Sequence, residues 1–210
     1  MAKPAMDRAA LTRMFAAPAD GHFGTSKVMP LDDAIRAHVK PGMMLHFAYS
    51  EGRPMAASNA LVRVFAGTEP GFTIVSAGLV SNQAALVTER IVGKLIVSFV
   101  GENYPTPAPN RLFQAAIDGG AVEVENHSLL AISQRLAAGA YGFPFMPTRS
   151  WAGSSLAENA CYREMDDPFG GGGKIGVLSA LVPDVTFVHG LAADTEGNII
   201  LSPPFGEGDL

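Results

Sequence analysis

A glutamate that follows an apolar run is the carboxylate of this chain best placed for chemistry. Glu102 comes directly after the run 97–101, and its neighbours Gly101 and Asn103 indicate a backbone turn that would hold the side chain. A carboxylate in such a place can act as a nucleophile or as a general base. The structural alternative is a solvated loop side chain that bonds to nearby amides. Glu102 is therefore the candidate catalytic residue, with both interpretations open.

An arginine stands alone in a nearly uncharged segment of the second half of the chain. Arg149 lies between Thr148 and Ser150. Because an unpaired guanidinium is costly to bury, we expect Arg149 to pair with a carboxylate or phosphate of a ligand, or with an acidic side chain across an interface. Arg149 and Ser150 are candidate substrate-binding residues.

Motifs for several other chemistries fail in this sequence. The stretch 169–174 reads FGGGGK, but Pro168 and Ile175 stand where a phosphate-binding loop needs Gly and Ser or Thr, so we expect a flexible loop or lid. No G-x-S-x-G motif occurs, which argues against a serine hydrolase. The five histidines are scattered, and the one cysteine, Cys161, excludes an internal disulfide and a cysteine-based metal site. We expect no metal.

Short apolar runs alternate with amphipathic stretches in the first two thirds of the chain. The runs 43–48, 73–76 and 95–100 predict buried strands, with a short strand at 122–124. Helices are predicted over 55–65, over 111–118, and over 127–138 with Asn126 as cap and Gly139 as end. Strands that are apolar on both faces and separated by helices predict an α/β fold with an open, mostly parallel sheet and helices on both faces.

In such a sheet, ligands bind beyond the carboxyl ends of the strands. The predicted ends are 49–53, 76–82 and 101–110, which are rich in Gly, Ser, Asn, Pro and Tyr. The candidate substrate-binding residues at these ends are Tyr49, Ser50, Arg53, Ser76, Gly78, Asn82, Gly101 and Asn103.

The chain changes character after residue 142. The stretch 143–156 is expected to be irregular, 175–181 and 185–190 are strand-like, and a short strand at 199–201 follows a turn at 194–198. No predicted helix covers that last strand, so we expect a fold that is incomplete at its C-terminus. The expected organisation is an N-terminal arm over 1–26 and one domain over 27–210.

The composition bounds the class of protein. The 210 residues carry a net charge of −5 without a basic cluster, which argues against a nucleic-acid surface. Charged residues make up 17%, below the usual ~25%, so we expect a large and nearly neutral interface with a partner. No apolar run of ~18 residues and no signal peptide occur, so we expect no membrane span and a cytoplasmic location.

Five segments, taken together, resemble the A-type subunit of family I coenzyme A transferases, the glutaconate and 3-oxoacid CoA-transferase group. The last two are the most specific, and all five keep the order of the family from about residue 27 onward. They are 31–42 (LDDAIRAHVKPG), 53–56 (RPMA), 109–120 (PNRLFQAAIDGG), 135–156 (RLAAGAYGFPFMPTRSWAGSSL) and 183–198 (PDVTFVHGLAADTEGN).

The resemblance implies two similar halves, A and B, that enclose the active site between them. A glutamate of the B half attacks the acyl-CoA thioester, and mixed-anhydride and glutamyl-CoA intermediates follow. The A half helps to bind substrate and to stabilise oxyanions. The resemblance thus implies a B-like partner half, a hetero-oligomer, acyl-CoA and a carboxylic acid as substrates, and no permanently bound cofactor.

The sequence departs from the family pattern at three places. No glycine occurs from 45 until Gly52, where relatives have a glycine-rich turn, and Leu129 stands where one branch of ring-opening hydrolases uses a glutamate. The chain also ends about a dozen residues after the D-x-x-G-N turn. CoA transfer is the first interpretation. The alternatives are a hydrolase or lyase that acts on an acyl compound, and a non-catalytic half that binds acyl-CoA or stabilises a partner.

Overall fold

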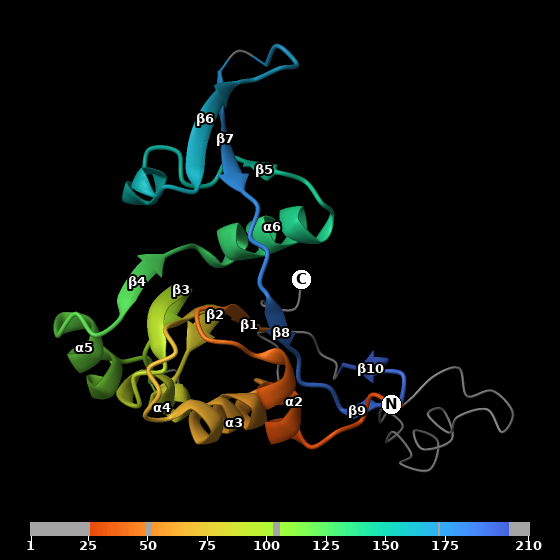
Figure 1. Cartoon of the computed structure of the whole chain (residues 1–210). Coiled ribbons are helices and arrows are strands. Elements are labelled where there is room, and N and C mark those ends of the chain that lie inside the picture. Colours follow the sequence, from red (N-terminus) through yellow and green to blue (C-terminus); the bar gives the residue numbers. More distant parts are fainter. Residues whose placement is uncertain (1–25, 49–51, 103–105, 172, 202–210) are drawn as a thin grey trace, which may run out of the picture.

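The computed structural model describes residues 26–48, 52–102, 106–171 and 173–201, and a parallel sheet is its largest element (Figure 1). The sheet has the strand order β4-β3-β2-β1-β8, and every neighbouring pair is parallel. The sequence prediction of a mostly parallel sheet is confirmed. The expected arm lies outside the described residues up to residue 25. The strands are β1 (Met44–Phe47), β2 (Phe72–Leu79), β3 (Val92–Val100), β4 (Glu123–Asn126) and β8 (Val185–Phe187).

One row of residues that are paired across neighbouring strands shows which face of this sheet is buried. This row crosses all five strands through apolar residues that belong to the main core or pack against it. Because successive residues of a strand point to opposite faces, such a row commits one whole face to the core. The row runs through Val185, Leu45, Ile74, Leu95 and Val124.

Helices cover both faces of the sheet, as expected. Four helices on the core side bury Ile35, Leu61, Leu86 and Phe113 against the strands. On the opposite face, α6 (Leu129–Ala140) packs Ile132 against the sheet. The four helices of the core side are α2 (Leu31–His38), α3 (Met55–Phe65), α4 (Ala85–Thr88) and α5 (Arg111–Asp118).

The ends of α6 differ from the sequence prediction. Asn126 is not its cap, because β4 continues through this residue and pairs it with Val97 of β3. Ser128 is the cap instead, and its Oγ accepts a hydrogen bond from the Ala131 N–H at 3.2 Å. Gly139 does not end the helix. A Cβ there would lie 2.5 Å from the Leu181 carbonyl oxygen, so glycine lets α6 approach the β7–β8 connection.

A small antiparallel sheet stands on the far side of α6 from the parallel sheet (Figure 1). Its order is β5-β7-β6, built from β5 (Phe145–Thr148), β6 (Tyr162–Asp166) and β7 (Lys174–Ser179). The prediction that 143–156 is irregular is wrong for β5, which accommodates Pro147 because it is an edge strand. The described residues Gly170, Gly171 and Gly173 lie between β6 and β7, in agreement with the loop expected there.

The remaining short elements lie at connections. The turn expected at 194–198 is confirmed, since Asp194 Oδ1 accepts the backbone N–H of Asn198 at 2.9 Å between β9 and β10. Within the described residues, no helix is long and apolar enough to cross a bilayer. These elements are η1 (Ser81–Gln83), η2 (Ser155–Glu158), β9 (Ala192–Ala193) and β10 (Ile199–Ile200).

Candidate functional site

The carboxyl ends of the parallel strands all lie along one edge of the sheet. This edge receives Arg53 after β1, Asn82 after β2, and Gly101 and Glu102 after β3. The first connection is tightly packed, because a Cβ on Gly52 would clash with the His189 ring that follows β8. The fold therefore gathers loops from several strands at one place, which is the arrangement that binds ligands in open α/β sheets.

Glu102 is held at this edge by both its backbone and its side chain. Its N–H donates to the Ala108 carbonyl at 2.7 Å, and the Ala108 N–H donates back at 3.1 Å. The Asn110 side-chain amide donates to Glu102 Oε1 at 2.5 Å. A Cβ on Gly101 would lie 2.6 Å from the Ala108 carbonyl oxygen, so this close approach requires glycine. The half-buried carboxylate is thus fixed rather than freely solvated.

The other predicted site residues divide into three groups. A loop beginning at Ser76 was predicted wrongly, because β2 continues to Leu79 and buries both Ser76 and Gly78. The Ser76 hydroxyl contacts the Phe47 and Gly78 carbonyl oxygens at 3.3 and 3.2 Å. Arg149, which is exposed, and Ser150 directly follow β5 of the antiparallel sheet and not a strand of the parallel sheet. Outside the described residues lie Tyr49, Ser50 and Asn103.

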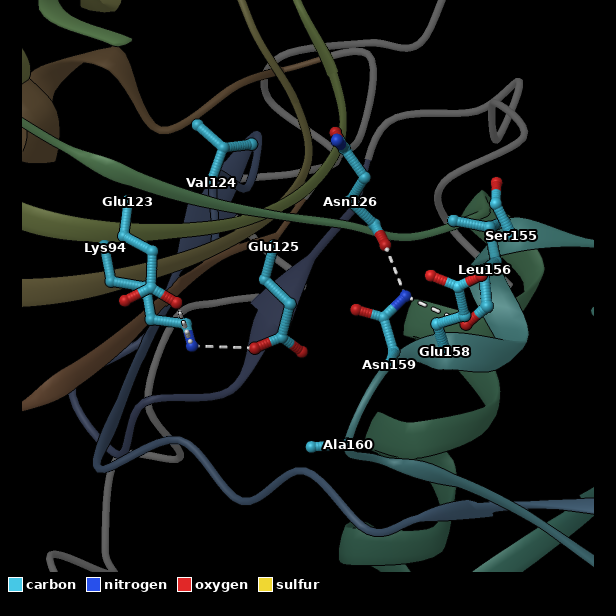
Figure 2. A pocket seen from close by; sticks show the side chains of 10 residues that line it. All are labelled: Lys94, Glu123, Val124, Glu125, Asn126, Ser155, Leu156, Glu158, Asn159 and Ala160. Carbon is cyan, nitrogen blue, oxygen red and sulfur yellow. Dashed lines mark hydrogen bonds and ion pairs between the residues drawn. The ribbon is translucent and has the colours of Figure 1, made fainter. Parts of the chain in front are cut away.

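A cavity of about 500 Å³ lies on the flank of the sheet, between β4 and the segment from η2 to β6 (Figure 2). Three carboxylates and one ammonium line it. Lys94 Nζ contacts Glu125 Oε2 at 2.8 Å and Glu123 Oε1 at 2.9 Å, and hydrogen bonding to Glu125 and Glu123 raises the pKa of the lysine. The negative balance disfavours the phosphates of CoA. The lining residues are Lys94, Glu123, Val124, Glu125, Asn126, Ser155, Leu156, Glu158, Asn159 and Ala160.

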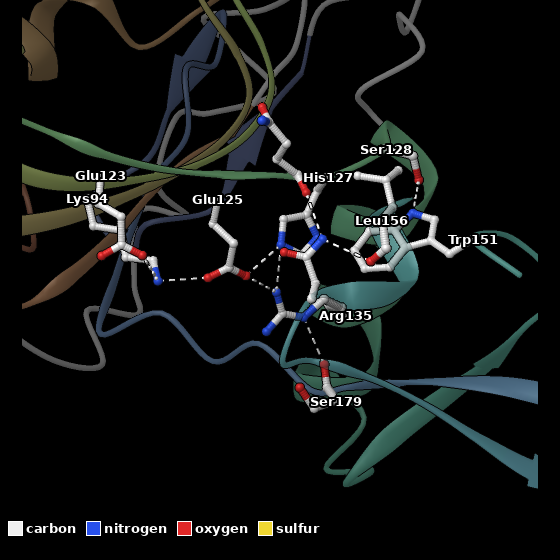
Figure 3. A network of polar contacts seen from close by, with 11 residues as sticks. Lys94, Glu123, Glu125, His127, Ser128, Arg135, Trp151, Leu156 and Ser179 are labelled. Carbon is white, nitrogen blue, oxygen red and sulfur yellow. Dashed lines mark hydrogen bonds and ion pairs between the residues drawn. The ribbon is translucent and has the colours of Figure 1, made fainter. Parts of the chain in front are cut away.

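A buried charge network lies behind this cavity (Figure 3). Glu125 Oε1 is 2.7 Å from His127 Nε2 and 3.5 Å from Arg135 Nη1. Arg135 Nε also donates to the Ser179 carbonyl of β7 at 3.0 Å. Hydrogen bonding to His127, together with Lys94, lowers the pKa of Glu125 to about 2 despite its burial. The network therefore joins β4, the edge strand of the parallel sheet, to α6 and to the antiparallel sheet.

The sole tryptophan completes this network. The Trp151 Nε1–H donates to Ser128 Oγ at 3.0 Å, and the Trp151 ring lies 4.9 Å from that of His127. Trp151 adopts φ of +78°, a backbone region that costs a bulky residue strain. Its surroundings must therefore hold it there, and they do so through the His127 and Tyr162 rings and the hydrogen bond to Ser128.

One cluster brings together three groups of the kind that bind metals. Ligand atoms of Glu125, His127 and Cys161 lie within 4.8 Å of one another. The Arg135 Nη1 is already 3.2 Å from His127 Nε2, and burial raises the pKa of the Cys161 thiol. A cation of the chain thus neutralises this cluster, and we assign it a structural role.

Sequence reasoning missed this network, although part of it left a signal. The alternation V-E-V-E at 122–125 places both glutamates on one face of a strand. That pattern could have indicated the pairing with Lys94 on the neighbouring strand. No local sequence pattern predicts the part that Arg135 plays, because its contact with Glu125 depends on how α6 crosses the sheet.

His46 provides a testable titration near the carboxyl end of β1. Its Nδ1 lies 3.5 Å from Thr186 Oγ1, and burial lowers its pKa from 6.5 to about 4. Because unfolding lets the ring bind a proton more readily, stability should fall as the pH drops from 6.5 to 4. We expect the free energy of unfolding of His46→Gln to fall by about 1 kcal/mol less than that of the parent across this range. This figure allows for solvent near a half-buried ring. Urea titrations at several pH values measure this, and parallel curves would contradict it.

Comparison with known proteins gives the family. The family model described as coenzyme A transferase matches residues 28–209. The chain belongs to the coenzyme A transferase family. The resemblance expected from the five sequence segments is thus confirmed.

Curated members of this coenzyme A transferase family support the match. The chain is 33% identical over 131 residues to the A subunit of 3-oxoadipate CoA-transferase from Pseudomonas knackmussii, covering 59% of this chain and 46% of that protein. It is 31% identical over 116 residues to the A subunit of a probable succinyl-CoA:3-ketoacid coenzyme A transferase from Bacillus subtilis, covering 55% and 43%. The chain spans less than half the length of these relatives.

Solved structures share the fold of this coenzyme A transferase family member. Glutaconate coenzyme A-transferase from Acidaminococcus fermentans matches with a TM-score of 0.75 at 22% identity, over 87% of this chain and 62% of that one. A variant of the decarboxylase AibA/AibB matches with a TM-score of 0.74 at 24% identity, over 86% and 68%. A transferase and a decarboxylase thus carry the same architecture, so the fold alone does not choose between these reactions.

Proposed function

We propose that this chain is the A-like half of an enzyme that moves coenzyme A between an acyl-CoA and a carboxylate, together with a B-like half. The family match over residues 28–209 carries this proposal. Curated relatives named as the A subunits of CoA-transferases support the division into two halves. The B-like half would be a separate chain or a further segment.

The proposed reaction uses a glutamate of the B-like half as nucleophile. Its carboxylate attacks the thioester carbonyl carbon, the C–S bond breaks, and CoA leaves as a thiolate. The thiolate then attacks the glutamyl carbonyl of the resulting mixed anhydride, which frees the original acyl group as a carboxylate. The incoming carboxylate reverses these two steps. Every step exchanges one acyl substituent for another, so no redox cofactor is required.

This chain would supply one wall of the shared cleft. We assign the candidate catalytic carboxylate of this half to Glu102, because its backbone and side chain are both fixed at the carboxyl edge. Substrate-binding groups would come from the segments that follow β1, β2 and β3, where the described residues include Arg53, Asn82 and Gly101. The exposed Arg149 is suited to a carboxylate or phosphate, since a guanidinium can bind either in bidentate fashion.

A hydrolase or lyase on the same scaffold is the second candidate. Leu129, 39% exposed at the start of α6, stands where the resemblance implies a glutamate in one branch of ring-opening hydrolases. An apolar side chain cannot transfer a proton, so a hydrolase or lyase here would have to use other groups than that branch. The shared architecture of the decarboxylase AibA/AibB keeps a lyase compatible with this fold. Acyl-CoA turnover in this case would proceed without a glutamyl-CoA intermediate.

Chemical trapping distinguishes the two reactions. The chain, co-produced with its B-like half, is incubated with an acyl-CoA and then treated with borohydride or hydroxylamine. CoA transfer predicts a modified glutamate in the B-like half, detected by peptide mass spectrometry. Release of free acid without a modified glutamate would instead support the hydrolase.

Substitution of Glu102 tests the role assigned to this chain. We expect Glu102→Gln to lower the turnover number of the complex by about 10²-fold, because the amide keeps the shape of the side chain but loses the negative charge that would help to place the reacting groups. Arg149→Ala should raise KM for the carboxylate more than it lowers turnover. Full turnover by both variants in an intact complex would favour the non-catalytic interpretation.

A further inference from the structure

Asn110 connects the candidate catalytic carboxylate to a helix. Its Oδ1 accepts the N–H groups of Leu112 and Phe113 at 2.9 and 3.2 Å, which caps the start of α5. Its Nδ2 donates to Glu102 Oε1 at 2.5 Å. The two backbone donors fix which atom of the amide is oxygen, so Nδ2 necessarily faces the carboxylate. One side chain thus serves a helix and a carboxylate together.

Few residue types could serve both roles. Asp and Ser cap helices about as well as Asn, but Asp has no proton to donate when ionised, and Ser offers one short hydroxyl. The backbone bridge between Glu102 and Ala108 brings Asn110 back to Glu102 across the loop. Capping of α5 alone could therefore be served by other residues, whereas capping together with hydrogen-bond donation to Glu102 requires Asn at position 110.

We propose that Asn110 is a positioning residue for the reaction. It holds Glu102 Oε1 by an amide hydrogen bond and couples the direction of the carboxylate to the rigid start of α5. This inference rests on the proposed function of Glu102. Precise placement of a reacting group affects rate strongly, and a shift of about 1 Å can cost ~10²-fold.

Two substitutions separate positioning from capping. Asn110→Ser keeps a cap and removes the amide donor, and Asn110→Asp keeps a cap and adds a repelling carboxylate. Acyl-CoA turnover, by transfer or by hydrolysis, is measured on the complete complex, and each variant is melted thermally. We expect each to lower turnover about 10-fold or more with little change in KM and melting temperature. As the pH is lowered, Asn110→Asp should also lose activity at a higher pH than the parent does, because two adjacent carboxylates resist joint ionisation.

A matched control is available elsewhere in the chain. Asn198 Nδ2 donates to Asp194 Oδ2 at 2.7 Å in the β9–β10 turn, and Asn198→Ser removes the same kind of bond. We expect this control to leave turnover unchanged. A double variant with Glu102→Gln provides the decisive comparison, because positioning predicts no further loss from Asn110→Ser once the carboxylate is gone.

The outcomes distinguish this inference from the proposed function. If Glu102→Gln is impaired while Asn110→Ser keeps full turnover, Asn110 does not position the carboxylate. Equal losses from Asn110→Ser in the parent and in the Glu102→Gln background would likewise reduce it to a cap. If Glu102→Gln turns over at the parental rate, the assigned role of Glu102 and the role of Asn110 both fail.

Discussion

Replacing Arg135 with methionine is expected to lower the free energy of unfolding by about 3 kcal/mol. The guanidinium side chain is 8% exposed and contacts Glu125, His127 and the Ser179 carbonyl oxygen. Methionine fills a similar volume but leaves the partly buried Glu125 without one of its cationic neighbours. Removal of one partner from a buried pair is costly because the remaining charge stays desolvated.

The loss of stability should also appear locally, at the junction between the two sheets. Arg135 lies on α6, its backbone oxygen accepts the Leu181 N–H at 2.9 Å, and its side chain reaches β7. We therefore expect amide exchange in the antiparallel sheet to accelerate more than in β2 or β3. Urea denaturation gives the free energy, and hydrogen-exchange mass spectrometry gives its distribution.

An exposed arginine provides the control. Arg36 pairs with Asp33 at 3.5 Å, with both side chains more than half exposed. Arg36→Met should cost under ~0.5 kcal/mol, because surface ion pairs of this kind contribute little. If Arg135→Met costs no more than Arg36→Met, the buried network does not stabilise the fold as described.

The parallel sheet was predictable because its signal is local. The runs around Leu45, Ile74 and Leu95 are continuous and apolar, as expected for strands covered on both faces. The carboxyl edge followed from the same reasoning, and it holds Arg53, Asn82, Gly101 and Glu102. Their roles remain predictions, since geometry places these residues without showing what they bind.

The antiparallel sheet was only partly predictable. The β6 sequence, YREMD, is mostly exposed and carries three charges, so it lacks the apolar alternation that marks a strand. Pairing with β7 supplies its backbone partners, and that pairing is long-range information. The start of α6 was misplaced by a similar conflict: Asn126 has the character of a cap, but pairing with β3 keeps it in a strand.

The polar network behind β4 lies at the limit of sequence reasoning. Arg135 stands in a helical segment of ordinary composition, and its nearest acidic partner is ten residues away in another element. Only the crossing of α6 over the sheet brings the guanidinium to Glu125. Networks of this kind follow from packing, whereas the caps and turns around Asn110 and Asp194 follow from the local sequence.

Acid is expected to weaken the protein through Glu125 over a defined range of pH. Its pKa is about 2 in the folded chain against an ordinary value of 4.5, so the unfolded chain binds the proton more readily. The stabilisation is present above pH 4.5 and is lost as the pH falls toward 2. The difference corresponds to about 3 kcal/mol, an order-of-magnitude figure for a partly buried group.

Glu125→Gln should therefore flatten the stability profile between pH 4.5 and 2, after an initial loss at neutral pH from weakened bonds to Lys94, His127 and Arg135. Glu123→Gln is the matched control, because Glu123 also pairs with Lys94 but is 67% exposed. It should leave the acid profile nearly parallel to that of the parent. The His46 titration falls mostly at higher pH, so the two effects separate in one series of urea titrations. If both glutamine variants have the same profile, the depressed pKa of Glu125 does not govern acid stability, and the network loses its electrostatic basis.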